Sequence, residues 1–491
     1  MSETHSNITD ERESRLKKLE ELRGLKINPY PNIYKPESHS DEVKRQFLSN
    51  GEQEFKTNVA GRIMLSRDFG KALFATIKDD PGSIQIYARK DVLGEEKYKI
   101  FKLLDVGDII GVNGKVFKTH KGEITVSVED FCLLSKSINS LPEKWHGLTD
   151  VEVRYRQRYI DLITNENVKN DFILRSKIIT FIRNLLIQKG FLEVETPMMQ
   201  LIPGGASARP FVTHHNALDT DMYLRIAPEL YLKRLIVGGF ERVFELNRNF
   251  RNEGIDTRHN PEFTMLELYQ AYGDYKDMMS LFEEIMAGAA TVVKGSPKFE
   301  YQGAPLDFSN WKKIKYVDAL KEFAGIDTSL LTTREDAVKL AETKGIHTED
   351  SFMDKWAIMN IVFEEFVEAN LMDPTIIYEY PAEISPLAKY KTDDPDFTER
   401  FEAYVCGREL SNAFSELNDP FVQKERFLAQ VKRKSQGDDE AMYMDEDYIN
   451  ALEYGMPPTG GMGIGIDRLG MFLIDTNSIR DTILFPTLKP R

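Results

Sequence analysis

Between residues 55 and 135, apolar and polar side chains alternate in five short runs separated by Gly, Asp and Asn. Alternation with a period of two is the pattern of a strand that buries one face. A helix-like segment, LGEEKYKIFKLL, lies between the third and fourth runs. Short strands in this order predict a small closed barrel of the OB type over 55–135. Another small β-barrel or a sandwich is the alternative.

On either side of this region, the apolar residues recur at a longer spacing. Residues 1–54 contain a predicted amphipathic helix over 9–25, with apolar side chains at three-residue steps, Leu16, Leu19 and Leu22. An NPYP turn follows this helix. We expect a linker over 136–164.

The remaining sequence predicts a large second domain over 165–491. It opens with a helix whose apolar residues have helical spacing, followed by Gly190 and a strand closed by Pro197. The region 275–380 is mostly helical in pattern and carries no recognisable chemistry. We interpret that region as further packing plus an inserted helical module.

The densest chemistry lies in 240–272, where two strand-like runs flank a polar loop that contains glycine. Alternation places functional side chains on one wall and apolar ones behind it. The wall comprises Glu245, Asn247, Asn249, Arg251 and Glu253 in the first run, and Phe263, Glu267 and Tyr269 in the second. An arginine, an aromatic ring and carboxylates suit a ligand with a phosphate, a flat base and a cationic group. The alternative is a hairpin with an ordinary polar face.

Carboxylates are also dense in 400–419, which contains Glu402, Glu409 and Glu416. Such a wall binds a hard cation or a basic ligand, because unpaired carboxylates repel one another. The alternative is a solvated acidic edge. Asn412 and Phe414 share a face with Glu416, whereas strict alternation puts Glu409 opposite them. A bulge or a kink nearby is therefore needed to bring all of them into one site.

Two further segments supply glycine beside charge. PPTGGMGIGIDRLGMFLI carries a glycine run that ends at Asp467 and Arg468, where an apolar helix begins. Its spacing is neither the dinucleotide-binding motif nor the P-loop. Around Gly205 a Gly-Gly loop precedes a strand, Pro228 and a helix with Glu229 in its first turn. The adjacent pair His214–His215 favours structural or surface roles over metal binding, because neighbours on a strand face opposite ways.

Composition narrows the class of protein. The net charge of the 491 residues is −15. Residues 1–150 carry 24 basic and 24 acidic side chains, so the excess acid lies in the rest and a broad nonspecific nucleic-acid binder is excluded. Two distant cysteines, a polar N-terminus and no apolar run of about 20 residues predict a cytoplasmic protein without a membrane segment or a structural zinc site.

Taken together, the motifs resemble those of class II aminoacyl-tRNA synthetases. The helix, strand and Pro197 resemble motif 1, FRNEG…RHNPEFTMLE resembles motif 2, and GGMGIGIDRLGMFL resembles motif 3. The barrel is similar to that of the lysine, aspartate and asparagine subgroup. PGGASARPF, APELYLKRL and ELSNAFSELND resemble the lysine-specific members, since the other two have glutamine at Glu229. The resemblance implies an α+β fold, with an N-terminal OB-fold barrel ahead of a class II catalytic domain built on an antiparallel sheet of six or seven strands flanked by helices.

The resemblance also implies substrates and roles. It implies a homodimer with Pro197 at the interface, which forms lysyl-adenylate from L-lysine and ATP with Mg²⁺ and transfers the lysyl group to the 3′ end of tRNA(Lys). Arg251 and Arg468 are the implied catalytic residues, at the α- and γ-phosphates. The implied ATP-binding residues are Arg251, Glu253, His259, Asn260, Phe263, Glu402 and Arg468, and the implied metal ligands are Glu402 and Glu409. The implied lysine-binding residues are Gly205, Glu229, Arg251, Glu267, Tyr269, Asn412, Phe414 and Glu416.

The barrel is expected to bind the anticodon by stacking and by reading base edges. Our candidates are Phe74 and Gln85, with Arg67 and Glu123 as weaker ones. For Phe74 the alternative is an ordinary place in the barrel core. Two other functions remain open: a lysine-activating paralogue that modifies a protein, and a non-catalytic nucleic-acid-binding protein. The paralogues lack the barrel, and the intact arginines and glutamates argue against a dead enzyme.

Overall fold

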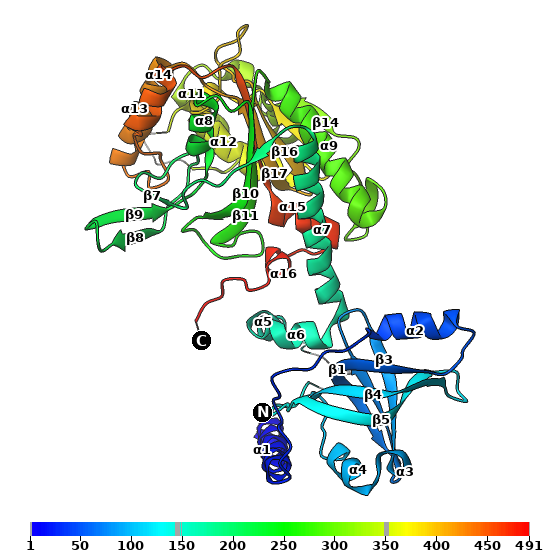
Figure 1. Ribbon diagram of the computed structural model, residues 1–491. Helices are drawn as coiled ribbons and strands as arrows, with labels where there is room; N and C mark the ends of the chain where they lie inside the picture. Colours follow the sequence, from blue (N-terminus) through cyan, green and yellow to red (C-terminus); the bar gives the residue numbers. More distant parts are fainter. Residues whose placement is uncertain (1, 143–147, 149, 348–352, 491) are drawn as a thin grey trace. The chain divides into compact units, whose positions relative to one another are not determined.

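A computed structural model describes residues 2–142, 148, 150–347 and 353–490 (Figure 1). Parts of the expected linker 136–164 and of the insertion 275–380 therefore lie outside the described residues. The chain divides into two compact units, Met1–Thr149 and Asp150–Arg491. Each unit has its own hydrophobic core.

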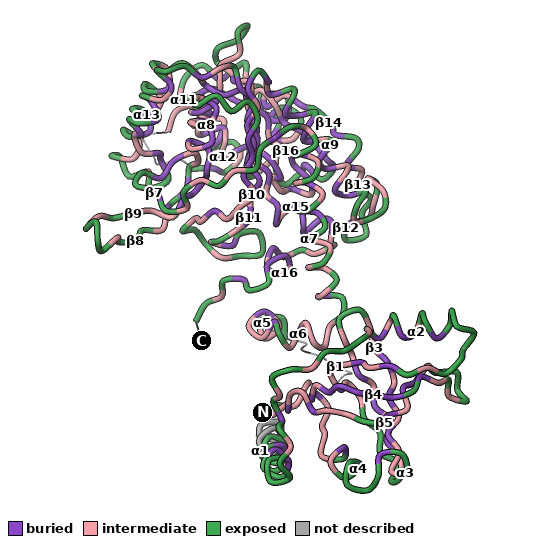
Figure 2. Tube along the Cα trace, viewed as in Figure 1, coloured by how far each residue is buried: buried purple, intermediate pink, exposed green. Residues whose placement is uncertain are grey.

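The first unit is the predicted closed five-stranded barrel. Its strands are β1 (Phe55–Asp68), β2 (Ala72–Lys78), β3 (Ser83–Arg89), β4 (Ile109–Lys118) and β5 (Ile124–Ser135). They close in the order β1-β2-β3-β5-β4. The short helices α3 (Lys90–Leu93) and α4 (Glu95–Phe101) stand between the third and fourth strands, as predicted. Alternate residues of β2 and β3 are buried in the interior, and Figure 2 marks buried positions along the barrel strands.

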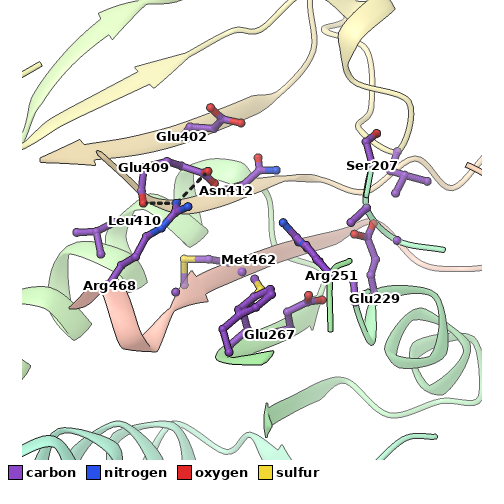
Figure 3. A pocket seen from close by; sticks show the side chains of 18 of the residues that line it. Ser207, Glu229, Arg251, Glu267, Glu402, Glu409, Leu410, Asn412, Met462 and Arg468 are labelled. Atoms are coloured by element: carbon purple, nitrogen blue, oxygen red, sulfur yellow. Dashed lines mark hydrogen bonds and ion pairs between the residues drawn. The ribbon is translucent and has the colours of Figure 1, made fainter. Parts of the chain in front are cut away.

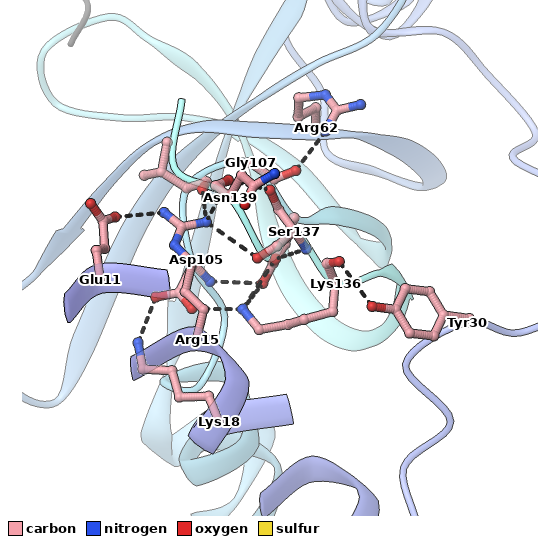
Figure 4. A network of polar contacts seen from close by, with 12 residues as sticks. Glu11, Arg15, Lys18, Tyr30, Arg62, Asp105, Gly107, Lys136, Ser137 and Asn139 are labelled. Carbon is pink, nitrogen blue, oxygen red and sulfur yellow. Dashed lines mark hydrogen bonds and ion pairs between the residues drawn. The ribbon is translucent and has the colours of Figure 1, made fainter. Parts of the chain in front are cut away.

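The N-terminal helix α1 (Ser2–Gly24) packs on this unit with a face that differs from the predicted one. Leu19 and Leu22 are buried as expected, but Leu16 is exposed and Arg15 is buried in its place. The reason is a polar network around the start of β4 (Figure 4). Arg15 donates to the Val106 carbonyl at 2.9 Å. A helix α2 (Ser40–Ser49) follows before the barrel.

Lys136 is the centre of that network. Its ammonium lies 2.6 Å from Asp105 and 2.8 Å from Asp108, and the side chains of Lys136 and Asp108 are fully buried. Lys18 of α1 reaches Asp105 at 2.5 Å. The network thus ties α1, the turn before β4 and the chain after β5 together.

The expected linker 136–164 is wrong in its second half. Helices α5 (Val151–Arg156) and α6 (Arg158–Thr164) occupy it and belong to the second unit, followed by α7 (Glu166–Gln188). The buried Arg158 forms an ion pair with Asp161 at 2.7 Å and donates to the Leu484 carbonyl at 3.0 Å. These contacts bind the segment to the C-terminal part of the chain, so it folds instead of remaining free.

The second unit is built on a sheet of eight strands, one or two more than expected. The order is β14-β15-β16-β17-β18-β11-β10-β6. Pairing is antiparallel except at the two edges, where β14 pairs with β15 and β6 with β10 in parallel. The strands are β6 (Leu192–Glu193), β10 (Arg242–Phe250), β11 (Glu262–Ala271), β14 (Lys312–Lys315), β15 (Thr375–Tyr378), β16 (Arg400–Val405), β17 (Arg408–Ser415) and β18 (Thr459–Gly465).

Helices cover both faces of this sheet. On one face α7, α9 (Tyr275–Lys294) and α15 (Ile466–Ile474) pack into the main core. On the other face α8 (Glu229–Val237), α13 (Pro420–Ser435) and α14 (Glu446–Glu453) cover only part of the sheet. A cavity lies on the part that these three helices leave open. No helix within the described residues has the length and apolarity that a bilayer crossing requires.

The region 275–380 differs from the predicted helical insertion. Helix α9 packs directly on the sheet, β14 and β15 are two of its strands, and β12 (Lys298–Tyr301) and β13 (Ala304–Asp307) form a hairpin. The helices α10 (Tyr316–Ala319), α11 (Arg334–Glu342) and α12 (Lys355–Phe366) build a separate core cluster against the sheet edge. The strands are only four residues long, too short for a pattern of two to stand out.

Candidate active site

The cavity encloses about 340 Å³ above strands β11, β16, β17 and β18. All fifteen residues predicted for ATP, lysine and metal line it: Gly205, Glu229, Arg251, Glu253, His259, Asn260, Phe263, Glu267, Tyr269, Glu402, Glu409, Asn412, Phe414, Glu416 and Arg468. Figure 3 shows Arg468 and Glu409 on one side, Arg251 and Glu229 on the other, and Asn412 between them. The sequence therefore identified the residues that meet, while their individual roles stay predictions.

The register of the sheet explains why these side chains converge. Glu402 pairs with Asn412, Asn412 with Gly463, and Gly463 with Glu267, so one row crosses four strands. The bulge that the sequence required is present: Tyr404 pairs with Glu409 but Ala403 pairs with Ser411. The extra residue, Leu410, turns Glu409 to the same face as Asn412.

The glycines of β18 make room for the site. A Cβ at Gly461 would lie 2.0 Å from Glu416 Oε1 and 2.6 Å from Tyr269 Cε1. A Cβ at Gly463 would lie 3.0 Å from Met265 Cε. We expected the glycine run to let a ligand approach the backbone. The structure adds that it also houses the side chains of neighbouring strands.

At one end of the cavity, Arg468 is held by three contacts. It donates to the Glu409 carbonyl at 2.7 Å, lies 3.4 Å from the Glu409 carboxylate, and lies 3.5 Å from His259 Nε2. His259 is oriented in turn by Asp256 at 3.0 Å. This end offers a fixed guanidinium and an imidazole to an anionic group.

Glu402 and Glu409 stand between that end and the centre. Glu402 accepts hydrogen bonds from Tyr380 at 2.9 Å and from Tyr404, and forms an ion pair with Arg400 at 2.5 Å. Within the described residues no group of three or more His, Cys, Asp or Glu could hold a metal ion. Two carboxylates on one face do fit Mg²⁺ that brings phosphate oxygens and water as its other ligands.

Arg251 and Phe263 form the central wall. The Arg251 guanidinium lies 5.2 Å from the centroid of the Phe263 ring. Its Nε is buried and has no hydrogen-bond partner among the described residues. An unsatisfied buried donor is unfavourable unless a ligand accepts from it. This arginine is thus placed to receive an anion, and the ring beside it offers a stacking face.

Asn260 lines the cavity, but its side chain is occupied. Its amide donates to the Glu262 carbonyl at 2.5 Å and its oxygen accepts from the Thr487 N–H at 3.1 Å. The observed contacts tie the C-terminal segment to the loop. An ATP contact from this side chain would require these bonds to be exchanged.

The other end of the cavity concentrates buried carboxylates. Tyr269 donates to Glu267 at 3.2 Å. Burial, and then the charge of Glu229, raises the pKa of Glu267 to about 8. Gly205 has φ +85°, and a Cβ there would lie 2.8 Å from Glu229 Cβ, so these two residues are close neighbours. Glu416 is 1% exposed. Such a group of acids requires a cation.

Two charged side chains that contact the predicted site residues escaped the sequence analysis. Lys233 contacts both Glu229 and Glu416. Arg400 joins Glu402 to Asn412, to which it donates at 3.1 Å. Arg400 stands two residues before Glu402, so alternation could have found it. Lys233 stands four residues after Glu229 on a helix, a spacing that also indicates contact.

The sequence analysis placed Glu245 on the functional wall, and the structure corrects that placement. It projects from the same face of the sheet as Glu267, with which it pairs, but it does not line the cavity. It forms an ion pair with Arg225 at 2.6 Å and accepts from Thr196 at 2.6 Å. Both charged side chains are almost fully buried. Alternation gives the face of a strand but not where along it the cavity ends.

On the barrel, the candidates for base recognition share the outer surface. Phe74 lies between Leu73 and Ala75, which are buried, and is itself only half-buried, so it is not a core residue. Arg67 pairs with Phe74, and Gln85 lies on the adjacent strand, where it accepts from Thr125 at 2.9 Å. Glu123 is exposed in the turn before β5.

Sequence analysis missed two aromatic residues of the same surface. Tyr87 stacks on Phe74 with ring centroids 4.2 Å apart, and Phe117 lies 6.2 Å from Tyr87. Tyr87 occupies the same alternating positions as Gln85, so the period of two pointed to it. The three rings form a row on which flat groups can stack.

Pro197 is exposed after β6. Large apolar side chains near it are exposed as well, among them Leu192 at 47%, Met199 at 53% and Leu201 at 60%. Apolar exposure of this kind is common where a surface contacts another protein, a ligand or a membrane.

The cavity on an antiparallel sheet, with an arginine beside an aromatic ring and carboxylates on a bulged strand, defines the class. The chain belongs to the class II tRNA synthetases (D, K and N), whose family model matches residues 150–489. A model described as an OB-fold nucleic acid binding domain matches residues 57–134.

Individual relatives narrow the comparison. The lysine--tRNA ligase of Syntrophomonas wolfei is 57% identical over 493 residues, covering 100% of this chain and 99% of that protein. The lysine--tRNA ligase of Pelotomaculum thermopropionicum is 59% identical, covering 97% of this chain and 94% of that protein. The lysine--tRNA ligase of Staphylococcus epidermidis is 54% identical, covering 99% of both.

Proposed function

We propose that this chain activates L-lysine with ATP and transfers the lysyl group to tRNA(Lys). The observation that carries the proposal is the cluster of buried carboxylates, Glu229, Glu267 and Glu416, at one end of a cavity whose other end presents arginines. A diamino acid supplies two ammonium groups to the acids. ATP supplies phosphates to the arginines. The curated relatives carry the name lysine--tRNA ligase.

In the first step a lysine carboxylate oxygen attacks the α-phosphorus of ATP. The bond from that phosphorus to the bridging oxygen breaks, and pyrophosphate leaves. Arg251, whose buried Nε lacks a partner among the described residues, stabilises the charge that develops at the α-phosphate. Arg468 holds the γ-phosphate, and Phe263 stacks on adenine. Glu253 and His259 complete the nucleotide contacts.

The amino acid is held at both ends. Gly205 and Glu229 receive the α-ammonium group, and Asn412 joins Arg251 at the carboxylate. Glu267, Tyr269 and Glu416 receive the side-chain ammonium, and Phe414 lines the slot between them. Because aspartate and asparagine bring no side-chain cation, they would leave buried carboxylates unpaired, which is strongly unfavourable.

Mg²⁺ belongs to the same proposal. Glu402 and Glu409 would hold it, since the bulge at Leu410 turns Glu409 to the cavity face on which Glu402 already lies. When bound, the metal neutralises charge on the phosphates. Arg400, through its ion pair, orients Glu402.

In the second step a ribose 3′ hydroxyl of tRNA attacks the lysyl carbonyl and AMP leaves. The row of Phe74, Tyr87 and Phe117 on the barrel supports single-stranded anticodon bases by stacking, with Gln85 reading base edges. Arg67 and Glu123 flank this surface. The excess of acidic side chains lies in the other unit. Recognition of the tRNA therefore depends on such local contacts.

We further propose that two copies associate through the surface around Pro197, because Leu192, Met199 and Leu201 are exposed beside it. Sedimentation of the purified chain should give twice the chain mass. The variant in which Met199 and Leu201 are both replaced by Asp should sediment with the mass of one chain. We place the protein in the cytoplasm, a proposal supported by two cysteines that form no disulfide.

The test of the activity is ATP–pyrophosphate exchange with lysine, aspartate or asparagine, each without tRNA. Exchange with lysine alone is expected. Exchange with aspartate or asparagine would contradict the specificity, and exchange with none would favour a non-catalytic nucleic-acid-binding protein. Transfer of labelled lysine to tRNA(Lys), with protein as the competing acceptor, then separates this function from that of a protein-modifying paralogue.

A further inference from the structure

A lysine of the protein lies behind the wall of the amino-acid slot. Lys233 is on α8, one turn after Glu229, and is 0% exposed. Its Nζ lies 2.6 Å from Glu229 Oε1 and contacts Glu416 Oε2. Figure 3 shows Glu229 at the cavity, whereas Lys233 is not among the residues that line it. The ammonium therefore touches these acids from the side away from the substrate.

Glu416 depends on this lysine. The carboxylate is buried, and apart from Lys233 neither oxygen has a hydrogen-bond partner among the described residues. A buried carboxylate without a partner takes up a proton, because burial favours the neutral form. Although burial alone would lower the pKa of Lys233, the charges of Glu229 and Glu416 raise it, so Lys233 remains a cation.

The charges of the slot are consistent with a diamino acid. Three carboxylates, Glu229, Glu267 and Glu416, lie at this end, and Lys233 is in contact with two of them. When lysine is bound and all three carboxylates are ionised, the ammonium of Lys233 offsets one negative charge and leaves two. The substrate assigned above brings two ammonium groups and presents its carboxylate to Arg251. Without Lys233 the slot would carry one negative charge too many.

We propose that Lys233 is a positioning residue for amino-acid specificity: its ammonium fixes the Glu416 carboxyl in the slot and favours its charged form, so that the slot selects a side chain with a cation. This inference rests on the proposed function. Lys233 acts through Glu416 and does not touch the substrate. Its contact with Phe414, 5.4 Å from the ring centroid, helps to hold the ammonium in place.

The experiment compares Lys233→Met with the wild type in ATP–pyrophosphate exchange, using lysine and norleucine, which has the same chain length without the cation. We expect the KM for lysine to rise about tenfold or more, with kcat changed only a few-fold. The preference for lysine over norleucine in kcat/KM should fall by about tenfold or more. Titration of active sites corrects for any loss of folded protein.

Two further variants make the test specific. Lys424→Met removes a lysine whose side chain is 48% exposed and should change neither KM nor preference. Glu416→Gln should lower the preference, and adding Lys233→Met to it should lower it no further, because the charge that Lys233 supports is already gone. This double variant removes both charges together, which keeps the test open if Lys233→Met alone folds poorly.

Three results would overturn the proposal. A lower KM for lysine in Lys233→Met would mean that Lys233 competes with the substrate. An equal loss for lysine and norleucine would mean a purely structural role. An additional loss of preference in the double variant would mean that Lys233 does not act through Glu416. Failure of the proposed function is a separate result, since the wild type itself would then show no exchange with lysine.

Discussion

Protonation of the Glu267 carboxyl should make the affinity for lysine depend on pH. Its pKa is raised to about 8 by burial and then by Glu229, so most of it is protonated at neutral pH in the empty slot. An ammonium group beside it favours the charged form and lowers that pKa. Lysine binding should therefore release a proton. Affinity for lysine should rise from about pH 6 to about pH 8 and level off above, because the proton no longer has to be removed.

Calorimetry of lysine binding in two buffers with different ionisation enthalpies measures this proton. The apparent binding enthalpy should differ between the buffers for the wild type at neutral pH. Glu267→Gln should reduce the difference and weaken binding, since it has no proton to release, while Glu229 and Glu416, whose pKa values burial also raises, still do. Equal enthalpies for the wild type would show that Glu267 is already ionised in the empty slot.

Gly461 offers a second test at the scale of one residue. The space that a side chain at Gly461 would need is filled by Glu416 and Tyr269, which are both buried, so Gly461→Ala must displace them. A shift of about 1 Å in such groups can lower activity about a hundredfold, and we expect that loss in lysine-dependent exchange. Gly465→Ala is the matched control on the same strand, because its Cβ would meet Arg468 only at 3.6 Å. Equal activities of the two variants would contradict the packing argument.

Single residues also show what sequence alone could give. Phe263, Glu267 and Tyr269 were found because alternation and the family motifs point to the same positions. Lys233 was not, because a lysine on a helix is ordinarily solvated and nothing local reveals that it is fully buried. Only the fold brings Glu416, far along the chain, to its ammonium.

At the scale of elements, Asp467 fastens helix α15 to strand β11. It accepts from the Thr264 N–H at 2.7 Å and forms an ion pair with Arg175 of α7 at 2.7 Å. Asp467→Asn keeps the shape and loses the charge, which should cost about 1–3 kcal/mol of unfolding free energy. Arg468 and Phe263 lie on the two elements it joins, so the KM for ATP should rise more than the KM for lysine.

Urea unfolding and exchange kinetics measure the two effects of Asp467→Asn. Asp475→Asn is a control at the end of the same helix, because Asp475 is exposed and bonds to Gln302 outside the site. It should leave both KM values unchanged. A KM for lysine that rises as much as that for ATP would show that Asp467 supports the whole cavity and not the nucleotide end alone.

Long elements could be predicted from the sequence and very short ones could not, for a physical reason. The barrel strands of seven residues or more, and α7 with 23, repeat their pattern often enough to be recognised. Strands β14 and β15 have four residues each and belong to the sheet only through distant partners. The bulge on β17 was predicted because Glu409 and Asn412 disagreed in parity, although its position at Leu410 follows only from the pairing.

At the scale of the whole molecule, the two separate cores predict that a substitution can destabilise one unit and leave the other unit folded. Lys136→Met would leave Asp108 buried without its cation, and removing one partner of such a pair costs about 3–5 kcal/mol. Amide exchange in β1 and β4 should become faster. Lysine-dependent pyrophosphate exchange should be kept while charging of tRNA falls, because the amino-acid site is in the other unit.

Lys97→Met is the control for Lys136→Met within the barrel. Its ion pair with Asp130 is about half exposed on both sides, so its loss should change unfolding by less than about 1 kcal/mol and leave charging intact. If Lys136→Met also abolished pyrophosphate exchange, the catalytic unit would depend on the barrel for its own fold.

The division into two cores has a consequence for how strongly a tRNA is held. A substrate that touches both units makes its second contact at the effective concentration set by the first, so two weak contacts multiply into a firm one. Neither end of the tRNA needs high affinity alone. Charged product can then leave by releasing one contact at a time instead of both at once.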